Sequence, residues 1–173
     1  MIIRILEPFV KVVANYRLSF YDKWLTFMTN YHLVILKKHY LDAILKGDKT
    51  VESRFTRRRR SSFGQVRSGD KLFLKESSGP VCATATVAAV KNLQDLTPEQ
   101  IIEIKQQYNH YIIGSDEYWR SKNNCRFGFL VWLEDVEPIE PVRIGKKDWR
   151  GWVVLTEQEN FGLLKPGAVK KAQ

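Results

Sequence analysis

The sequence predicts an α+β fold: a small mixed β-barrel of five to six short strands with inserted helices. Short apolar runs recur along the chain between groups of Gly, Pro, Ser and Asp, a pattern typical of strands joined by turns. Helical segments are expected between these runs, and the one that begins at Thr97 carries a helix start signal. Because a closed barrel leaves no strand edge exposed, closure is the expected arrangement for so few short strands.

Size and composition agree with this fold. The chain has 173 residues, of which 44% are hydrophobic and 27% charged, enough for one domain with its own core. We expect an N-terminal extension over 1–28, a barrel domain over 29–156 and a partly disordered tail over 157–173. The extension is open to three interpretations: an accessory helix, a weak membrane-surface anchor, or translated sequence upstream of a true start at Met28. The last is favoured because patterned sequence begins only after that methionine.

The first predicted elements surround Gly47. Residues 33–36 form a short buried strand, and residues 39–46 form a helix with one apolar face. Gly47 ends this helix because glycine adopts a positive φ without strain. Residues 50–55 alternate between apolar and polar side chains, which is the period of a half-buried strand.

The later elements follow a basic loop over 57–64. Thr97 has the chemistry of a helix N-cap and Pro98 suits the first helical position, so a helix is expected from there to about Tyr108. The remaining predicted elements are strands over 71–75, 81–90, 127–136 and 152–155, and a second helix over 115–122.

The net charge of +9, from 28 basic and 19 acidic residues, favours a polyanionic partner. Residues 37–67 carry seven of these charges, since ten Lys and Arg face three acidic residues there. A second basic group comprises Arg143, Lys146, Lys147 and Arg150. Two interpretations have equal weight: a solvated face with a mobile Arg loop, or contact with phosphates, because clustered guanidinium groups release counterions from a nucleic-acid backbone.

The sequence predicts neither a metal site nor a cofactor. Cys82 and Cys125 are too few and too far apart for a zinc site or a disulfide scaffold, and His32, His39 and His110 lack the spacing of metal ligands. Reduced thiols in the cytoplasm are the simplest interpretation of the two cysteines. No apolar run approaches the roughly 20 residues of a membrane span.

The segment Gly47–Arg54 has the pattern G-x-K-x-x-E-x-R and is the main candidate for a binding site. We expect the turn at Gly47 to swing Lys49 across the mouth of the barrel, with Glu52 and Arg54 projecting from one face of the strand. A lysine, a carboxylate and a guanidinium together can bind a base edge and a phosphate or carbonyl group. The alternative is a surface strand with a self-satisfied Glu–Arg pair, and the spacing taken alone favours it.

A resemblance to a known family changes that balance. The motif in its helix–Gly–strand setting, the turn Val66–Asp70 (VRSGD) and the late segment Lys146–Leu155 (KKDWRGWVVL) resemble the ASCH domain family, which belongs to the PUA-like superfamily of β-barrels. The resemblance covers about Tyr31 to Leu155. It implies a PUA-like barrel with a cleft lined by the Lys, Glu and Arg of the motif, and RNA binding as the general function.

Some small members of that family resemble amidohydrolases that remove the acyl group from N4-acetylcytidine. In those, the resemblance implies three working residues: the motif Lys, a Thr at the position of Glu52, and a Glu in the helical connection. This sequence keeps Lys49, has Glu52 in place of the Thr, and offers Glu103 or Glu117 as the third residue. Lys49 and Glu52 are therefore the catalytic candidates if the chain is an enzyme.

Two functions of different classes follow. The favoured one is an RNA-binding module that recognises RNA or a modified nucleoside, because a run of Arg beside the cleft suits a polymer; no specificity for DNA is inferred and the oligomeric state is left open. The alternative is a small amidohydrolase acting on N4-acetylcytidine-like nucleosides. Trp149 is a candidate for base stacking, whereas Tyr118 and Trp119 either stack on a base or fasten the helices to the barrel. The candidate RNA-binding residues are Lys49, Glu52, Arg54, Arg57, Arg58, Arg59, Arg60, Lys147, Trp149 and Arg150.

Overall fold

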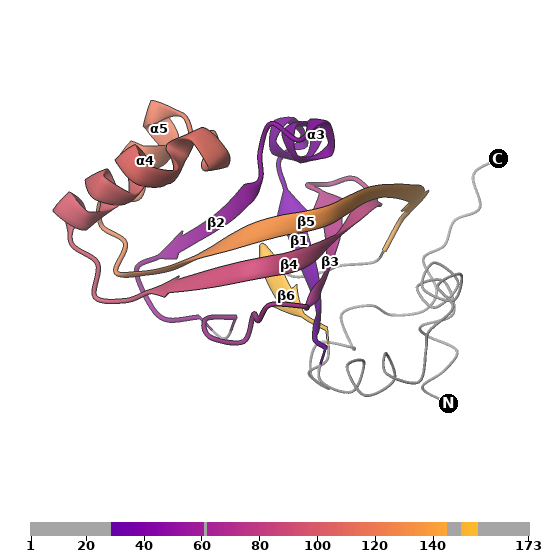
Figure 1. Cartoon of the computed structure of the whole chain (residues 1–173), viewed down its shortest axis with the longest axis horizontal. Coiled ribbons are helices and arrows are strands. Elements are labelled where there is room, and N and C mark those ends of the chain that lie inside the picture. Colours follow the sequence, from indigo (N-terminus) through magenta and orange to yellow (C-terminus); the bar gives the residue numbers. More distant parts are fainter. Residues whose placement is uncertain (1–28, 61, 145–149, 156–173) are drawn as a thin grey trace.

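A computed structural model describes residues 29–60, 62–144 and 150–155 of the chain. Six strands form one mixed sheet in the order β2-β5-β4-β3-β1-β6 (Figure 1). The expected N-terminal extension and C-terminal tail lie outside the described residues. The elements are β1 (Tyr31–Leu36), α3 (Lys38–Lys46), β2 (Val51–Thr56), β3 (Lys71–Glu76), β4 (Val81–Leu93), α4 (Pro98–Ile112), α5 (Asp116–Arg120), β5 (Phe127–Val142) and β6 (Trp152–Val154).

The predicted α+β class is confirmed, but the sheet is a curled half-barrel rather than a closed barrel. β1 pairs in parallel with β3 and the other neighbours pair antiparallel. β2 and β6 are the two ends of the strand order, and no ladder joins them in the part of the chain that the structure describes. The long β4–β5 pair contains register shifts of the kind that bend and twist a sheet. The expected closure is wrong because side chains, not a backbone ladder, occupy the gap between the two ends.

The helix before the motif ends as predicted. Gly47 has a φ of +81° and follows α3 directly. The next turn is held by the Lys49 N–H, which donates to the carbonyl of Ala43 at 3.1 Å. α3 buries Leu41 and Ile44 against the sheet, so the position of the motif is fixed by the packing of the helix that precedes it.

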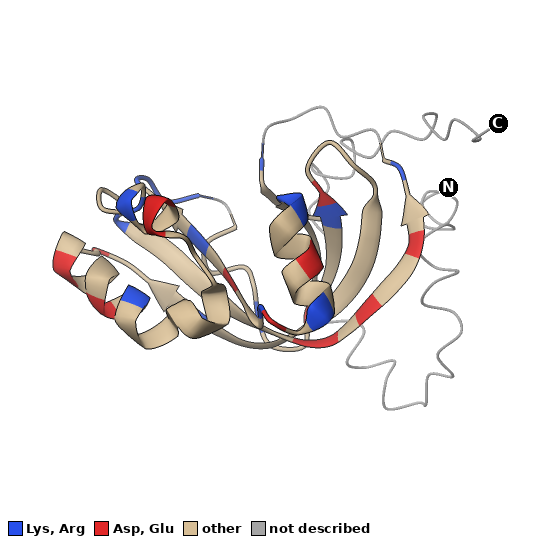
Figure 2. Cartoon of the chain, turned by 90° about the horizontal axis from the view of Figure 1, so that it is seen from above, with Lys and Arg blue, Asp and Glu red and all other residues tan. Residues whose placement is uncertain are grey.

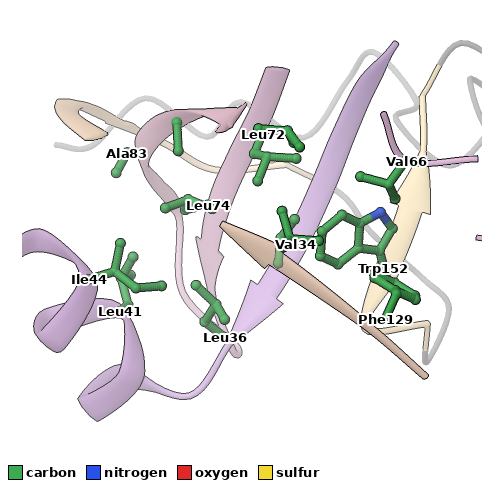
Figure 3. Close-up of a cluster of buried hydrophobic side chains, with 13 residues drawn as sticks. Val34, Leu36, Leu41, Ile44, Val66, Leu72, Leu74, Ala83, Phe129 and Trp152 are labelled. Carbon is green, nitrogen blue, oxygen red and sulfur yellow. The ribbon is translucent and has the colours of Figure 1, made fainter. Parts of the chain in front are cut away.

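One hydrophobic cluster packs α3 against the strands, as Figure 3 shows for Leu41 and Ile44 beside the side chains of β1 and β3. A second cluster joins β2 to the helical insert between β4 and β5 and includes Val51, Ile101 and Leu130. The prediction of a half-buried β2 is therefore wrong, because four of its six residues are buried and the insert covers one of its faces.

The insert consists of α4 and α5, which lie together at the β2 end of the sheet (Figure 1). Thr97 forms the predicted N-cap, and its hydroxyl and the Gln100 side chain make a reciprocal capping box. α4 continues to Ile112, four residues beyond the predicted end. Trp119 is 3% exposed, donates its indole N–H to Asn109 Oδ1 at 2.8 Å and packs edge-on against Phe55. Of its two predicted roles, the structure supports fastening of the insert.

Among the described residues, no helix is long and apolar enough to cross a membrane. No group of three or more His, Cys, Asp or Glu side chains is placed to hold a metal ion in residues 29–60, 62–144 and 150–155.

Candidate nucleic-acid interface

A cleft of about 1050 Å³ lies between the two ends of the sheet. Its walls come from β1, β2 and β5, from α3 and α5, from the basic loop after β2, and from the start of β6 with the residues before it. Six basic residues and two acidic residues line it, which leaves a net of four positive charges. The basic residues are Lys37, Arg54, Arg59, Arg60, Lys122 and Arg150, and the acidic ones are Glu52 and Glu117.

Acidic residues are concentrated elsewhere. Glu134, Asp135, Glu137 and Glu140 follow one another along the distal half of β5, where Figure 2 shows the red segments on the outer strand. These four residues do not line the cleft. The described chain thus has a cleft of net positive charge and a separate acidic stretch along the distal half of β5.

The three charged residues of the motif form a chain of ion pairs, in which Lys49 and Glu52 are buried and Arg54 is partly exposed. The Lys49 ammonium lies 3.3 Å from Glu52 Oε2, and Arg54 Nε lies 3.0 Å from Glu52 Oε1. Lys49 also donates to the carbonyls of Val51 at 2.6 Å and Ile112 at 2.9 Å. Its side chain is 2% exposed, and it is absent from the cleft lining, whereas Glu52 and Arg54 belong to that lining. The cleft lining implied by the family resemblance therefore differs at Lys49, which lies behind Glu52.

Burial lowers the pKa of the Lys49 ammonium, and the neighbouring Glu52 carboxylate partly opposes that shift. The Glu52 side chain is 9% exposed, so its pairing with two cations is poorly screened by water. The alternative interpretation of the motif is correct in its Glu–Arg pair, which forms, but wrong in placing the strand at the surface, because Glu52 is buried and also pairs with the buried Lys49.

Arg54 spans the gap between the two ends of the sheet. It projects from β2 and donates Nη2–H to the carbonyl of Ile35 on β1 at 2.9 Å. Its guanidinium carbon lies 5.7 Å from the ring centroid of Trp152 on β6. A Cβ at Gly151 would come within 2.7 Å of Arg54 Nη1, so any larger residue there would require the guanidinium to shift. Arg54 thus bridges the two ends of the sheet, and much of its guanidinium already contacts other residues of the protein.

A buried polar chain holds Trp152 in the cleft wall. Its indole N–H donates to His32 Nδ1 at 3.2 Å, and His32 Nε2 lies 2.9 Å from Asp70 Oδ2. Because Nδ1 accepts a hydrogen bond, the ring proton is on Nε2 and is donated to the carboxylate. Asp70 also accepts from the backbone N–H groups of Asn30 and Arg67. The Asp of the VRSGD turn is therefore part of the support for the cleft.

Two tyrosines lie beside Glu52 in the cleft, Tyr40 from α3 and Tyr118 from α5. Burial raises the pKa of both phenols, and the nearby Glu52 carboxylate adds to the effect. The Tyr118 hydroxyl and the Ser53 hydroxyl are 2.7 Å apart. Lys122, one helical turn later, places its ammonium 4.7 Å from the centroid of the Tyr118 ring, and burial lowers the pKa of that ammonium.

The structure brings together some of the predicted site residues. Glu52, Arg54, Arg59, Arg60 and Arg150 line the cleft, and Lys49 supports it from behind. Arg57 and Arg58 are exposed and do not line it, and Lys147 and Trp149 lie outside the described residues. The sequence analysis missed Lys37, Tyr40, Lys122 and Trp152. The spacing of Tyr118 and Lys122, four residues apart in a predicted helix, was a signal that could have placed both on one face.

Comparisons with known proteins agree with this architecture. The family model of the ASCH domain matches residues 34–161. The chain belongs to the ASCH domain family. Its fold resembles the crystal structure of ASCH from Zymomonas mobilis, with a TM-score of 0.58, 17% identity, and coverage of 78% of this chain and 92% of that chain.

Two single-substitution variants of the Zymomonas mobilis protein match in the same way. One has a TM-score of 0.58 at 17% identity, covering 76% of this chain and 94% of that chain. The other has a TM-score of 0.50 at 18% identity, covering 65% of this chain and 72% of that chain. At these identities the likeness shows a shared ASCH fold and not a shared activity. A search of curated proteins gives no match.

Proposed function

We propose that this ASCH domain binds an unpaired stretch of RNA in the cleft between the two ends of its sheet. The observation that carries the proposal is the combination of size and charge in that cleft. Pockets for small ligands have volumes of about 300 to 1,000 Å³, and this cleft of about 1050 Å³ exceeds the space of one nucleoside while six basic residues line it. A strand of several nucleotides supplies both the volume and the phosphates.

The position of the Arg loop supports a polymer rather than a free nucleoside. Arg59 and Arg60 line the cleft on one side, and Lys122 and Arg150 line it elsewhere. Basic residues from several elements along one cleft suit successive phosphates of a strand. RNA binding has been proposed as a function of the ASCH domain family, and the basic lining of this cleft supports the same function here.

The aromatic residues of the cleft support unpaired RNA rather than a duplex. Tyr40 and Tyr118 are partly buried there. Proteins recognise single-stranded RNA by stacking bases on such rings and by hydrogen bonds to base edges, neither of which a paired A-form helix allows.

Substitution of two lysines, one in the cleft and one outside it, tests whether RNA binds in the cleft. Lys122 lines the cleft, and Lys91 on β4 does not, although each places its ammonium over a tyrosine ring, at 4.7 and 5.1 Å respectively. Affinity for a fluorescent single-stranded 12-mer is measured by anisotropy at several salt concentrations. We expect Lys122→Glu to weaken binding by about tenfold or more and Lys91→Glu to have little effect.

Melting temperatures of both variants serve as the control for folding. Equal losses of affinity in the two variants would show that net charge matters and the cleft does not. Binding that is absent in the unmodified protein, or that does not weaken with salt, would contradict the proposed function itself.

A further inference from the structure

One group in the cleft has no role in a general attraction to phosphate: the carboxylate of Glu52. A negative charge among six cations works against phosphate binding, yet Glu52 belongs to the cleft lining. Its position therefore needs an explanation from a ligand group that donates hydrogen bonds. The inference below rests on the proposed function and specifies which base the cleft takes.

Glu52 is fixed as an acceptor. Lys49 Nζ lies 3.3 Å from Oε2 and Arg54 Nε lies 3.0 Å from Oε1, so each oxygen has one cation beside it. A carboxylate between two cations accepts hydrogen bonds and donates none. A carboxylate has about four lone-pair sites, so each oxygen keeps capacity for one donor from the cleft. The result is a pair of acceptors side by side with a fixed orientation.

The orientation of this pair is preorganised by its partners. Lys49 is anchored to the carbonyls of Val51 and Ile112, and Arg54 to the carbonyl of Ile35 and the face of Trp152. The carboxylate thus needs no reordering when a ligand arrives, which strengthens its preference for a complementary edge.

The four RNA bases differ in how they meet two adjacent acceptors. Guanine presents N1–H and an N2 amino group next to each other, so it donates to both oxygens. Cytosine and adenine each offer one amino group beside a ring nitrogen whose lone pair faces the second oxygen. Uracil offers one N–H between two carbonyls. For these three bases at least one acceptor meets another acceptor, which is repulsive.

We infer that Glu52 reads the Watson–Crick edge of an unpaired guanine in the bound RNA. Tyr40 and Tyr118 line the cleft beside Glu52, where their rings can flank a base whose edge meets the carboxylate. The phenols keep their protons because burial raises the pKa of both, so they add no further negative charge. Basic residues of the cleft hold the phosphates on either side of the base.

The test uses the full chain and a series of 5′-labelled RNA 9-mers. All are uridine except at the centre, which is guanine, inosine, adenine, cytosine or uracil. Anisotropy titrations should give the guanine oligomer an affinity about tenfold above the adenine, cytosine and uracil oligomers, the size of one good bidentate contact. Inosine lacks the amino group and should lose most of that advantage.

Two variants assign the preference to a residue. Glu52→Gln replaces one acceptor by a donor and should abolish the preference for guanine without reducing the dependence of affinity on salt. Glu117→Gln is the matched control, because Glu117 is the other acidic residue of the cleft lining but is exposed on α5. It should keep the preference.

The base series on the unmodified protein decides the question even if Glu52→Gln fails to fold. Equal affinity for all five oligomers, or a guanine preference that survives Glu52→Gln, would overturn the inference while leaving the proposed function intact. Absence of salt-dependent binding to every oligomer would contradict the proposed function instead. Displacement of the labelled guanine oligomer by guanosine monophosphate at equal concentration would show that the cleft binds a free nucleotide and not an RNA strand.

Discussion

The ammonium of Lys49 lies 3.3 Å from the carboxylate of Glu52, and both side chains are buried. The same ammonium donates to the carbonyl of Ile112, the last residue of α4. The pair therefore does two things: it connects the helical insert to the start of β2, and it holds one of the two acidic groups that line a cleft of net positive charge. The most conspicuous lysine of the motif is a support for the site and not part of its surface.

Removal of this lysine should cost stability. In Lys49→Ala the carbonyls of Val51 and Ile112 lose a donor, and Glu52 loses one of its two cations while staying buried. Breaking a buried pair by deletion of one partner costs about 3 kcal/mol of unfolding free energy, which urea unfolding at pH 7 would measure.

Lys38→Ala is the control for that measurement. Lys38 is also paired with a carboxylate, that of Asp42 at 3.0 Å, but both side chains are exposed. Its removal should leave the unfolding midpoint nearly unchanged. Equal effects of the two substitutions would show that burial of the Lys49–Glu52 pair does not matter.

Tyr118 should make the protein sensitive to alkali. Burial raises the pKa of its phenol above the ordinary value of 10.0. A raised folded-state pKa gives stability that is fully present below about pH 10 and is lost as the pH rises through the folded value, because the unfolded chain ionises first. Each pH unit in that window costs about 1.4 kcal/mol of unfolding free energy.

Tyr118→Phe removes this dependence together with the 2.7 Å contact to the Ser53 hydroxyl. At neutral pH we expect the variant to be less stable by about 1 kcal/mol. Urea unfolding at several pH values should show that the unfolding free energies of the two proteins approach each other above pH 10. The lowered pKa of Lys49 makes stability rise with pH, which is the opposite sign, but it does so in both proteins. Its effect therefore cancels when their unfolding free energies are subtracted. A difference in unfolding free energy that stays constant across the alkaline range would show that Tyr118 does not cause the sensitivity to alkali.

The four arginines of the basic loop should not contribute equally to RNA binding. Arg59 and Arg60 line the cleft, whereas Arg57 and Arg58 do not. Each phosphate contact to a single strand contributes about 0.7 to the slope of log affinity against log salt. The double substitution of Arg59 and Arg60 by Ala should therefore flatten the slope by about 1.4.

The same double substitution at Arg57 and Arg58 removes an identical charge from the neighbouring positions. We expect it to change the slope by less than half as much, with the melting temperature of both variants close to that of the unmodified protein. A larger change for Arg57 and Arg58 would place the RNA outside the cleft.

The sequence predicted those features that depend on local chemistry. Gly47 ends α3 because the chain needs a positive φ there, and Thr97 begins α4 because its hydroxyl satisfies a free N–H group. Both signals involve residues close in sequence. Four of the predicted site residues, Glu52, Arg54, Arg59 and Arg60, line the cleft together because the motif and the basic loop lie next to each other along the chain.

The remaining features depend on contacts that local patterns do not encode. β2 alternates like a half-buried strand, but the insert that covers its other face comes from residues more than 40 positions later. The open barrel depends on Arg54 reaching Ile35 and Trp152, which lie on strands at the other end of the sheet. β5 extends past its predicted end at residue 136 to Val142 and includes Pro138. Proline is tolerated there because the β2–β5 pairing stops at Trp132, so this part of β5 pairs with β4 alone.

The last prediction separates RNA binding from amidohydrolase activity. We expect weak or absent hydrolysis of N4-acetylcytidine, because Glu52 stands where the resembling enzymes have Thr and lies between two cations. Burial lowers the pKa of Lys49, as a general base requires, but its ammonium is directed to Glu52 and two carbonyls and does not line the cleft.

Purified protein is incubated with the nucleoside, and release of cytidine is followed by chromatography. Lys49→Arg is the decisive variant, because an arginine keeps the charge but does not lose its proton near neutral pH. Of the two candidates for the third working residue, Glu117 lines the cleft and Glu103 does not, so Glu117→Gln completes the set. Robust release of cytidine that disappears in both Lys49→Arg and Glu52→Gln would overturn the proposed function. Such a result would mean that Lys49 loses a proton during turnover, which catalysis requires and RNA binding does not.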